Sequence, residues 1–299
     1  MAKKKTRAFI EGFGFYLPET KDHTQSVKGP NPVSESGLPD YLDNPKIPFY
    51  SQSVYTFNGL HTDSPVSPTH WMHGDNQELF EKNKKRMGTK WKYYDKTVTY
   101  TFNEHGYRCP EWDQIDWKNS IVLFGCSCTY GLGLSDEETI SAHLEKLSNR
   151  PVINLGVPGG SNSLMIQNAT NLLHFFEAPY AVANIWSTSD RFEYFLKDKI
   201  HRAGPWDGMS KSVGNVQKLW QYTYEYPEHE QGLNYYETKI GKWLWQDRSK
   251  YSAISFFPSI VTFTQLEKHF VMDHEARDLD HPGENNAIEV ANYLHERFK

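Results

Sequence analysis

The sequence has few cysteines and no long apolar run. Its 299 residues include three cysteines, Cys109, Cys126 and Cys128, which are too few for the disulfide framework of a small secreted domain. No apolar run reaches the roughly 18 residues of a membrane-spanning helix, and the apolar stretch 8–10 is too short for a signal peptide. We therefore expect a cytoplasmic protein with no membrane association.

A strong charge of either sign is also lacking. The formal net charge of -5 argues against a nucleic-acid-binding surface over the whole chain, and the short basic stretch 3–7 is typical of a solvated tail. Cys126 and Cys128 have the spacing of half a metal site, but no second Cys or His pair has the spacing of a zinc site. We expect no metal and no cofactor, and we interpret both cysteines as small packing residues rather than reactive thiols.

The first part of the chain lacks a regular hydrophobic period. Residues 1–80 are rich in Pro, Gly, Ser, Asn and Asp, yet they carry too many aromatic residues to be freely disordered. One short helix is expected over 76–86, and the alternation of apolar residues with threonine predicts a β-hairpin over 90–102. We interpret residues 1–117 as an irregular, aromatic-rich extension that covers the main domain or binds a protein partner or a second copy.

From residue 118 onward, the pattern changes to strands that alternate with helices. Strands are expected over 120–124, 152–155, 180–186 and 252–257, and helices over 136–148, 162–176 and 285–298. Such strands pair in parallel through right-handed crossovers, with helices on both faces of the sheet. The pattern predicts one three-layer α/β/α domain over 118–299.

A short glycine-bounded motif follows the first expected strand. Residues 125–131 read Gly-Cys-Ser-Cys-Thr-Tyr-Gly and place Ser127 at the carboxyl end of the strand, where open α/β sheets bind ligands. The glycines let the backbone turn and a substrate approach. Ser127 is therefore a candidate nucleophile; the alternative is a serine that only shapes the turn.

A serine hydroxyl reacts only when a base removes its proton and a third group orients that base. Near the end of the chain, residues 278–283 read Asp-Leu-Asp-His-Pro-Gly. Asp278 stands three residues before His281, so both side chains can lie on one side of a turn, and Nε2 of the imidazole could face Ser127. We expect Asp280 to point away. The alternative is a charged surface loop.

The two motifs resemble sequence blocks of the SGNH (GDSL-type) hydrolases. The first block of that family reads Gly-Asp-Ser-x-Thr-x-Gly, and residues 125–131 differ from it by Cys126 in place of Asp. The last block, Asp-x-x-His-Pro, is similar to residues 278–282 and likewise precedes a closing helix. The resemblance covers 118–299. It implies a flavodoxin-like parallel sheet and a Ser-His-Asp triad that cleaves esters through an acyl-enzyme.

The resemblance also implies hydrogen-bond donors for the oxyanion. Residues 154–159 match the Asn-x-x-x-x-Gly of the second block, so the N–H groups of Ser127 and Gly159 would face the oxyanion. A phosphate-binding turn is the weaker reading, because no Lys follows the glycines. The third block departs from the family, since Ser189 stands before Asp190 where the family has Asn. Either Ser189 or a neighbour donates less well, or the hole has two donors.

The substrate expected from this resemblance is an ester of a small molecule or of a glycan. SGNH enzymes act on lipid esters, thioesters and O-acetyl groups of sugars. The insertion before the last block carries the rings Trp206, Trp220, Tyr222, Tyr224, Tyr226, Tyr235, Tyr236, Trp243 and Trp245. Rings beside a shallow cleft would suit a carbohydrate O-acyl group, and rings that pack helices explain the composition equally well. The changed third block favours the alternative function, a binding or structural module of the same fold with weak or no catalysis.

Overall fold

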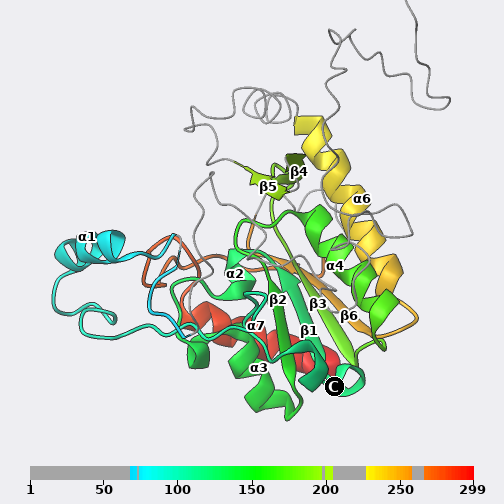
Figure 1. Ribbon diagram of the computed structural model, residues 1–299, viewed down its shortest axis with the longest axis horizontal. Coiled ribbons are helices and arrows are strands. Elements are labelled where there is room, and N and C mark those ends of the chain that lie inside the picture. Colours follow the sequence, from blue (N-terminus) through cyan, green and yellow to red (C-terminus); the bar gives the residue numbers. More distant parts are fainter. Residues whose placement is uncertain (1–67, 73, 197–198, 205–226, 258–265) are drawn as a thin grey trace, which may run out of the picture.

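A five-stranded parallel sheet forms the centre of the computed structural model, which describes residues 68–72, 74–196, 199–204, 227–257 and 266–299 (Figure 1). The strands, in spatial order, are β2 (Val152–Gly156), β1 (Ile121–Gly125), β3 (Ala181–Trp186), β6 (Lys250–Ser255) and β7 (Lys268–His269). All neighbouring pairs run parallel. This is the flavodoxin-like order, in which the winding direction reverses between β1 and β3. The predicted fold class is confirmed.

Helices cover both faces of this sheet (Figure 1). On one face α3 (Ile140–Ser148) packs against α7 (Glu284–Phe298), and on the other α4 (Asn162–Phe175) packs against α6 (Pro227–Trp245). Every residue of β1, β2 and β3 is buried, as expected for strands with helices on both sides. Because the strands are parallel, their carboxyl ends lie at one edge, where the candidate residues follow β1, β2 and β3.

The expected helix over 136–148 divides into two pieces at Thr139. A 3-10 turn, η5 (Asp136–Glu138), comes first, and α3 then begins with the Thr139 hydroxyl accepting a hydrogen bond from the N–H of Ala142 at 3.2 Å. The buried Glu138 carboxylate accepts from the N–H of Ser135 and forms ion pairs with Lys92 and Lys96 at 2.6 and 2.7 Å. Thr139 itself has an extended backbone, with φ of -75° and ψ of 159°, and separates the 3-10 turn from α3.

The β-hairpin predicted over 90–102 is absent, and that prediction was wrong. Tyr100 instead forms an isolated antiparallel bridge with Thr69, through N–H to carbonyl bonds of 2.8 and 3.0 Å. Tyr93, Val98 and Tyr100 are fully buried. The alternation therefore reflects rings and aliphatic groups that enter the main core, not pairing between two adjacent strands.

Residues 68–117 contribute directly to the core of the sheet domain. The helix expected over 76–86 is present as α1 (Gln77–Met87). Trp91, Tyr107 and Trp112 are buried in the same cluster as the side chains of β1. Residues 1–67 and the contacts predicted for them lie outside the described residues, and the division of the chain at 117 stays a prediction.

Two further findings complete the fold. A two-stranded antiparallel unit that the sequence did not predict, β4 (Phe192–Leu196) with β5 (Lys199–Ala203), follows β3. Among the described helices, none combines the length and the apolar character that a bilayer crossing requires.

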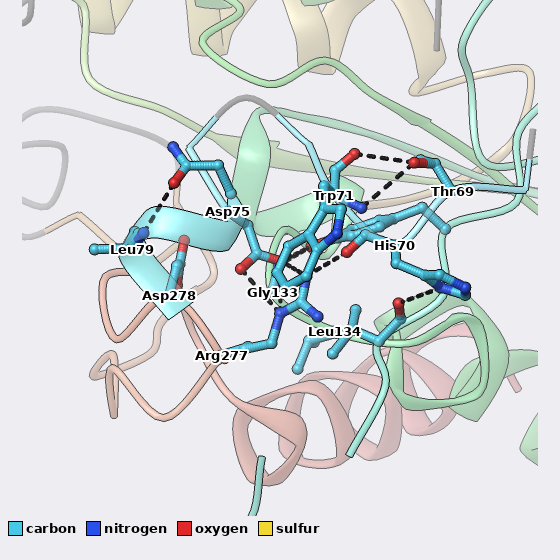
Figure 2. A network of polar contacts seen from close by, with 12 residues as sticks. Thr69, His70, Trp71, Asp75, Leu79, Gly133, Leu134, Arg277 and Asp278 are labelled. Carbon is cyan, nitrogen blue, oxygen red and sulfur yellow. Dashed lines mark hydrogen bonds and ion pairs between the residues drawn. The ribbon is translucent and has the colours of Figure 1, made fainter. Parts of the chain in front are cut away.

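A buried ion pair joins the segment before α1 to the loop before α7 (Figure 2). Arg277 and Asp75 have 1% and 0% of their surface exposed, and their closest atoms, Nη2 and Oδ2, are 2.7 Å apart. Removing one member of such a pair leaves the other charge buried without compensation.

We predict that Asp75→Ala lowers the free energy of unfolding by about 3–5 kcal/mol, measured by urea denaturation. The matched control is Asp95→Ala, because Asp95 pairs with Lys84 at 3.8 Å with 87% of its side chain exposed. That exposed pair should contribute less than about 1 kcal/mol. Equal losses in the two variants would contradict the prediction.

Candidate active site

Ser127 is the first residue of a short helix, α2 (Ser127–Tyr130), that follows β1 after one intervening residue. Gly131 ends this helix in the left-handed region, with φ of 78°, and its N–H bonds to the Ser127 carbonyl at 3.0 Å. The glycine before the helix is required by packing, since a Cβ on Gly125 would lie 1.8 Å from Oγ1 of Thr129. Gly125, Thr129 and Gly131 therefore form the turn that places Ser127 at the carboxyl end of β1.

Asn154 of β2 fixes α2 against the sheet. Its Nδ2 donates to the Thr129 carbonyl at 2.8 Å, and its Oδ1 accepts from the N–H of Gly156 at 3.0 Å. The side chain is fully buried. The Asn of the second motif thus holds α2, the helix that begins with Ser127, against the sheet.

The loop before α7 carries Asp278 and His281 side by side. Oδ2 of Asp278 is 2.5 Å from Nδ1 of His281, and Oδ1 accepts from the N–H groups of Asp280 and His281 at 3.1 and 3.2 Å. Asp278 is 4% exposed, whereas Asp280 lies on the surface. The acid nearer to the imidazole in space is therefore Asp278.

The structure brings His281 to Ser127 across 154 positions of sequence. Nε2 of His281 lies 2.7 Å from Oγ of Ser127. A carboxylate can only accept hydrogen bonds, so the contact with Asp278 assigns the proton of the neutral ring to Nδ1. Nε2 is then left as an acceptor for the Ser127 hydroxyl.

The surroundings of His281 raise the pKa of its imidazole. Burial alone lowers the pKa of the imidazole, but the hydrogen bond to Asp278 and the negative charge of that carboxylate outweigh this effect. Smaller contributions from Cys126 and Asp280 act in the same direction, and the net pKa is raised above its usual value. Asp278 therefore makes the ring a stronger base toward Ser127.

The two backbone N–H groups that the sequence predicts as oxyanion donors belong to Ser127 and Gly159. Among the described residues, neither the N–H of Ser127 nor that of Gly159 has a hydrogen-bond partner. Gly159 follows β2 and has a φ of 72°, a conformation that glycine adopts without strain. Both residues are buried at the carboxyl edge of the sheet.

The hydroxyl of Ser189, the third predicted donor, is engaged elsewhere in the structure. Its single proton goes to Oδ1 of Asn234 or to Oε2 of Glu237, the latter at 3.0 Å. Asn162 donates to Ser189 Oγ at 3.3 Å and holds the carbonyl and N–H of Ser187 at 2.9 and 2.8 Å. The loop after β3 is therefore fixed by a buried polar cluster.

Sequence reasoning missed three members of this polar cluster: Asn162, Asn234 and Glu237. Asn162 follows Ser161, the N-cap of α4, and its place beside an expected helix start was a usable signal. Glu237 lies on α6, and no local motif marks it. Burial raises the pKa of Glu237, against the opposing effect of its hydrogen bonds to Ser163, Asn162 and Ser189.

The cysteines and metal-binding groups offer no alternative site in the part of the chain that the structure describes. Cys126 and Cys128 are buried, unpaired thiols within the core. No cluster of three or more Cys, His, Asp or Glu side chains with metal-binding geometry occurs there.

The aromatic insertion is divided between surface, core and undescribed residues. Trp206, Trp220, Tyr222, Tyr224 and Tyr226 lie outside the described residues. Trp245 is fully buried and stacks on Phe124 with centroids 6.0 Å apart. On α6, Tyr236 and Trp243 each expose 62% of their surface and Tyr235 exposes 41%.

Fold and site together define an α/β protein with a hydrogen-bonded Ser-His-Asp group at the carboxyl edge of its sheet. No protein-family profile and no curated protein matches the sequence. Solved structures that match are lipolytic proteins and esterases of the GDSL and SGNH type, the family that the motifs resemble.

Three of these structures illustrate the likeness. A protein assigned to the G-D-S-L lipolytic family from Desulfitobacterium hafniense DCB-2 has 10% identity and a TM-score of 0.35, over 60% of this chain and 99% of that one. Esterase EstA from Pseudoalteromonas sp. has 15% identity and a TM-score of 0.35, over 60% and 96%. The SGNH-hydrolase family esterase AlinE4 has 17% identity and a TM-score of 0.26, over 47% and 60%.

We predict that the pKa of His281 lies above about 6.5 in the wild type and falls below that value in Asp278→Asn. The variant removes the charge that raises the pKa and leaves the burial that lowers it. Histidine ¹H–¹³C NMR titration measures both values, with His281→Ala to assign the signal. Asp280→Asn is the matched control, since that exposed carboxylate has only a small effect; an equal fall in both variants would contradict the assignment.

Proposed function

We propose that this protein is a serine hydrolase that cleaves carboxylic esters through an acyl-enzyme on Ser127. The observation that supports the proposal is the continuous chain Ser127 Oγ, His281, Asp278, with contacts of 2.7 and 2.5 Å. A hydroxyl, a base and an orienting carboxylate in this order activate serine in unrelated folds.

The proposed reaction has two halves that use the same imidazole. Ser127 Oγ attacks the ester carbonyl carbon while Nε2 of His281 takes the hydroxyl proton, and the tetrahedral intermediate then expels the alcohol, which receives that proton. Water, deprotonated by His281, next attacks the acyl-enzyme and releases the carboxylic acid and free Ser127. Asp278 stays ionised and stabilises the imidazolium in both halves.

The oxyanion of the intermediate would be bound by the N–H groups of Ser127 and Gly159. Both donors are fixed in place before reaction, and loss of one such donor typically costs a factor of about 10²–10³ in kcat. The hole in this proposal has two donors, because the Ser189 hydroxyl is bound to Asn234 and Glu237.

For the alcohol part of the substrate, we propose a sugar that stacks on the N-terminal half of α6. Glu237 of this helix contacts Ser189 at the carboxyl edge of the sheet. Tyr235 and Tyr236 directly precede Glu237, so they lie along α6 close to that edge. Trp243 comes almost two turns later, toward the opposite edge. Of the exposed rings, Tyr235 and Tyr236 therefore carry the glycan proposal.

We predict that the wild type hydrolyses p-nitrophenyl acetate and that Ser127→Ala and His281→Ala lower kcat by a factor of roughly 10⁴ or more. The control is His274→Ala, an exposed histidine of the same loop whose Nδ1 lies 3.2 Å from the Asp280 carbonyl; its kcat should match the wild type. An acetylated xylo-oligosaccharide serves as a second substrate, on which Tyr236→Ala should raise KM.

A folded wild type without Ser127-dependent hydrolysis would contradict the proposal and favour the binding module. Hydrolysis of the acetate with no preference for the acetylated sugar would retain the esterase and exclude the glycan.

A second prediction separates a two-donor from a three-donor oxyanion hole. Ser189→Ala should lower kcat less than tenfold, because that hydroxyl bonds to Glu237 and not to the substrate. Ser163→Ala is the matched control, as Ser163 also donates to Glu237, at 2.9 Å. If Ser189→Ala alone lowers kcat by the 10²–10³ of a lost donor, Ser189 is part of the hole.

A further inference from the structure

The residue before Asp278 is held from the opposite end of the described chain. Figure 2 shows the Arg277 guanidinium between Asp75 and the ring of Trp71. Its Nε and Nη2 donate to both oxygens of Asp75 at 2.7–3.1 Å, and its centre lies 4.3 Å from the Trp71 ring centroid. Nη2 also donates to the His70 carbonyl. The side chain of Arg277 is thus fixed by residues about 200 positions away.

Asn83 of α1 holds the backbone of the same loop. Its Nδ2 donates to the carbonyls of Arg277 and Asp278 at 3.2 and 3.1 Å, and the residue is 3% exposed. These bonds flank the α-carbon of Asp278. They fix the peptide planes from which the carboxylate projects toward His281.

Tyr100 connects this loop to the one that follows the Ser127 helix. Its hydroxyl donates to Asp75 and accepts from the N–H of Gly133 at 2.8 Å, while the Gly133 carbonyl accepts from the N–H of Arg277 at 3.1 Å. The turn after the Ser127 helix and the loop that carries Asp278 and His281 are therefore bonded to each other through Gly133. No space is left there, since a Cβ on Gly133 would lie 2.9 Å from the Arg277 nitrogen.

The loop needs such support because its backbone is strained. Leu279 has a φ of 59°, a left-handed conformation that is unfavourable for a branched side chain. This conformation lets the N–H groups of Asp280 and His281 both face Oδ1 of Asp278. Strained residues of this kind persist only where surrounding contacts fix them.

We propose that Asp75, Asn83, Tyr100 and Arg277, here called the acid brace, position Asp278 and His281 for proton transfer from Ser127. The four are positioning residues, because they act on the backbone and side chain of the acid and not on the substrate. Their effect on catalysis rests on the proposed esterase function, and their effect on His281 itself does not.

The test compares two Asn→Ala variants of the same helix. Asn83→Ala removes the bonds to Arg277 and Asp278; Asn76→Ala removes only the N-cap bond to the N–H of Leu79, at 2.9 Å. With p-nitrophenyl acetate, we expect Asn83→Ala to lower kcat about 10- to 100-fold at unchanged KM, as for a catalytic group displaced by about 1 Å. Asn76→Ala should lower Tm and leave kcat unchanged.

A second readout does not depend on activity. In the Asn83→Ala variant the Asp278–His281 bond is loosened, so the pKa of His281 in an NMR titration falls relative to the wild type; in Asn76→Ala it does not. Tyr100→Phe keeps the buried ring and should lower both kcat and the pKa of His281, as Asn83→Ala does. This variant replaces Asn83→Ala if the latter does not fold.

The outcomes separate the two proposals. If the wild type is inactive but Asn83→Ala still lowers the pKa of His281, the esterase proposal is overturned and the acid-brace proposal is supported. An active wild type in which Asn83→Ala and Asn76→Ala share the same kcat and the same His281 pKa overturns the brace, and assigns these residues to stability alone.

Discussion

The hydrogen bond between Ser127 and His281 is the contact on which the account of this protein depends. It joins side chains 154 positions apart at 2.7 Å, so both α2, which carries Ser127, and the loop before α7, which carries His281, must be fixed in position. The parallel sheet positions α2, because the ends of β1, β2 and β3 lie at one edge. The loop before α7 is not positioned directly by a strand of the sheet.

Residues 68–117 help to fix both the turn after α2 and the loop before α7. Arg108 donates to the carbonyls of Gly131 and Leu134 at 2.8 and 3.1 Å and pairs with Asp136, so the turn after the Ser127 helix is fixed from this segment. Asp75 and Asn83 fix the loop that carries Asp278. The segment therefore completes the site, although it contributes no group to the Ser-His-Asp chain.

The strands and helices were predictable where the hydrophobic pattern of the sequence matches the burial of the element. The runs that became β1, β2 and β3 are buried throughout and mostly apolar, as expected for strands covered on both faces. The helices α1 and α4 begin at an Asn and a Ser cap. The same reasoning failed over 90–102. There Tyr93, Val98 and Tyr100 alternate because a loop buries them in the core, and period alone does not distinguish this from a strand pair.

The site was predictable only as far as local motifs reach. Ser127, Asp278 and His281 stand in short patterns with chemical meaning, and their mutual distance required the structure. Asn83 and Glu237 stand in no pattern, because each acts on a segment far away in sequence. Asn162 is marked only by its place beside the Ser161 cap of α4. The Ser189 hydroxyl shows the same limit, since its partners Asn234 and Glu237 come from α6.

The most direct test of the central claim is covalent labelling with a fluorophosphonate, mapped by mass spectrometry of the digested protein. A serine activated by His281 attacks phosphorus and releases fluoride, so the wild type should carry one adduct, on Ser127, and His281→Ala should carry none. Absence of an adduct on the folded wild type, an adduct on another serine, or equal labelling of Ser127 in His281→Ala would contradict the account.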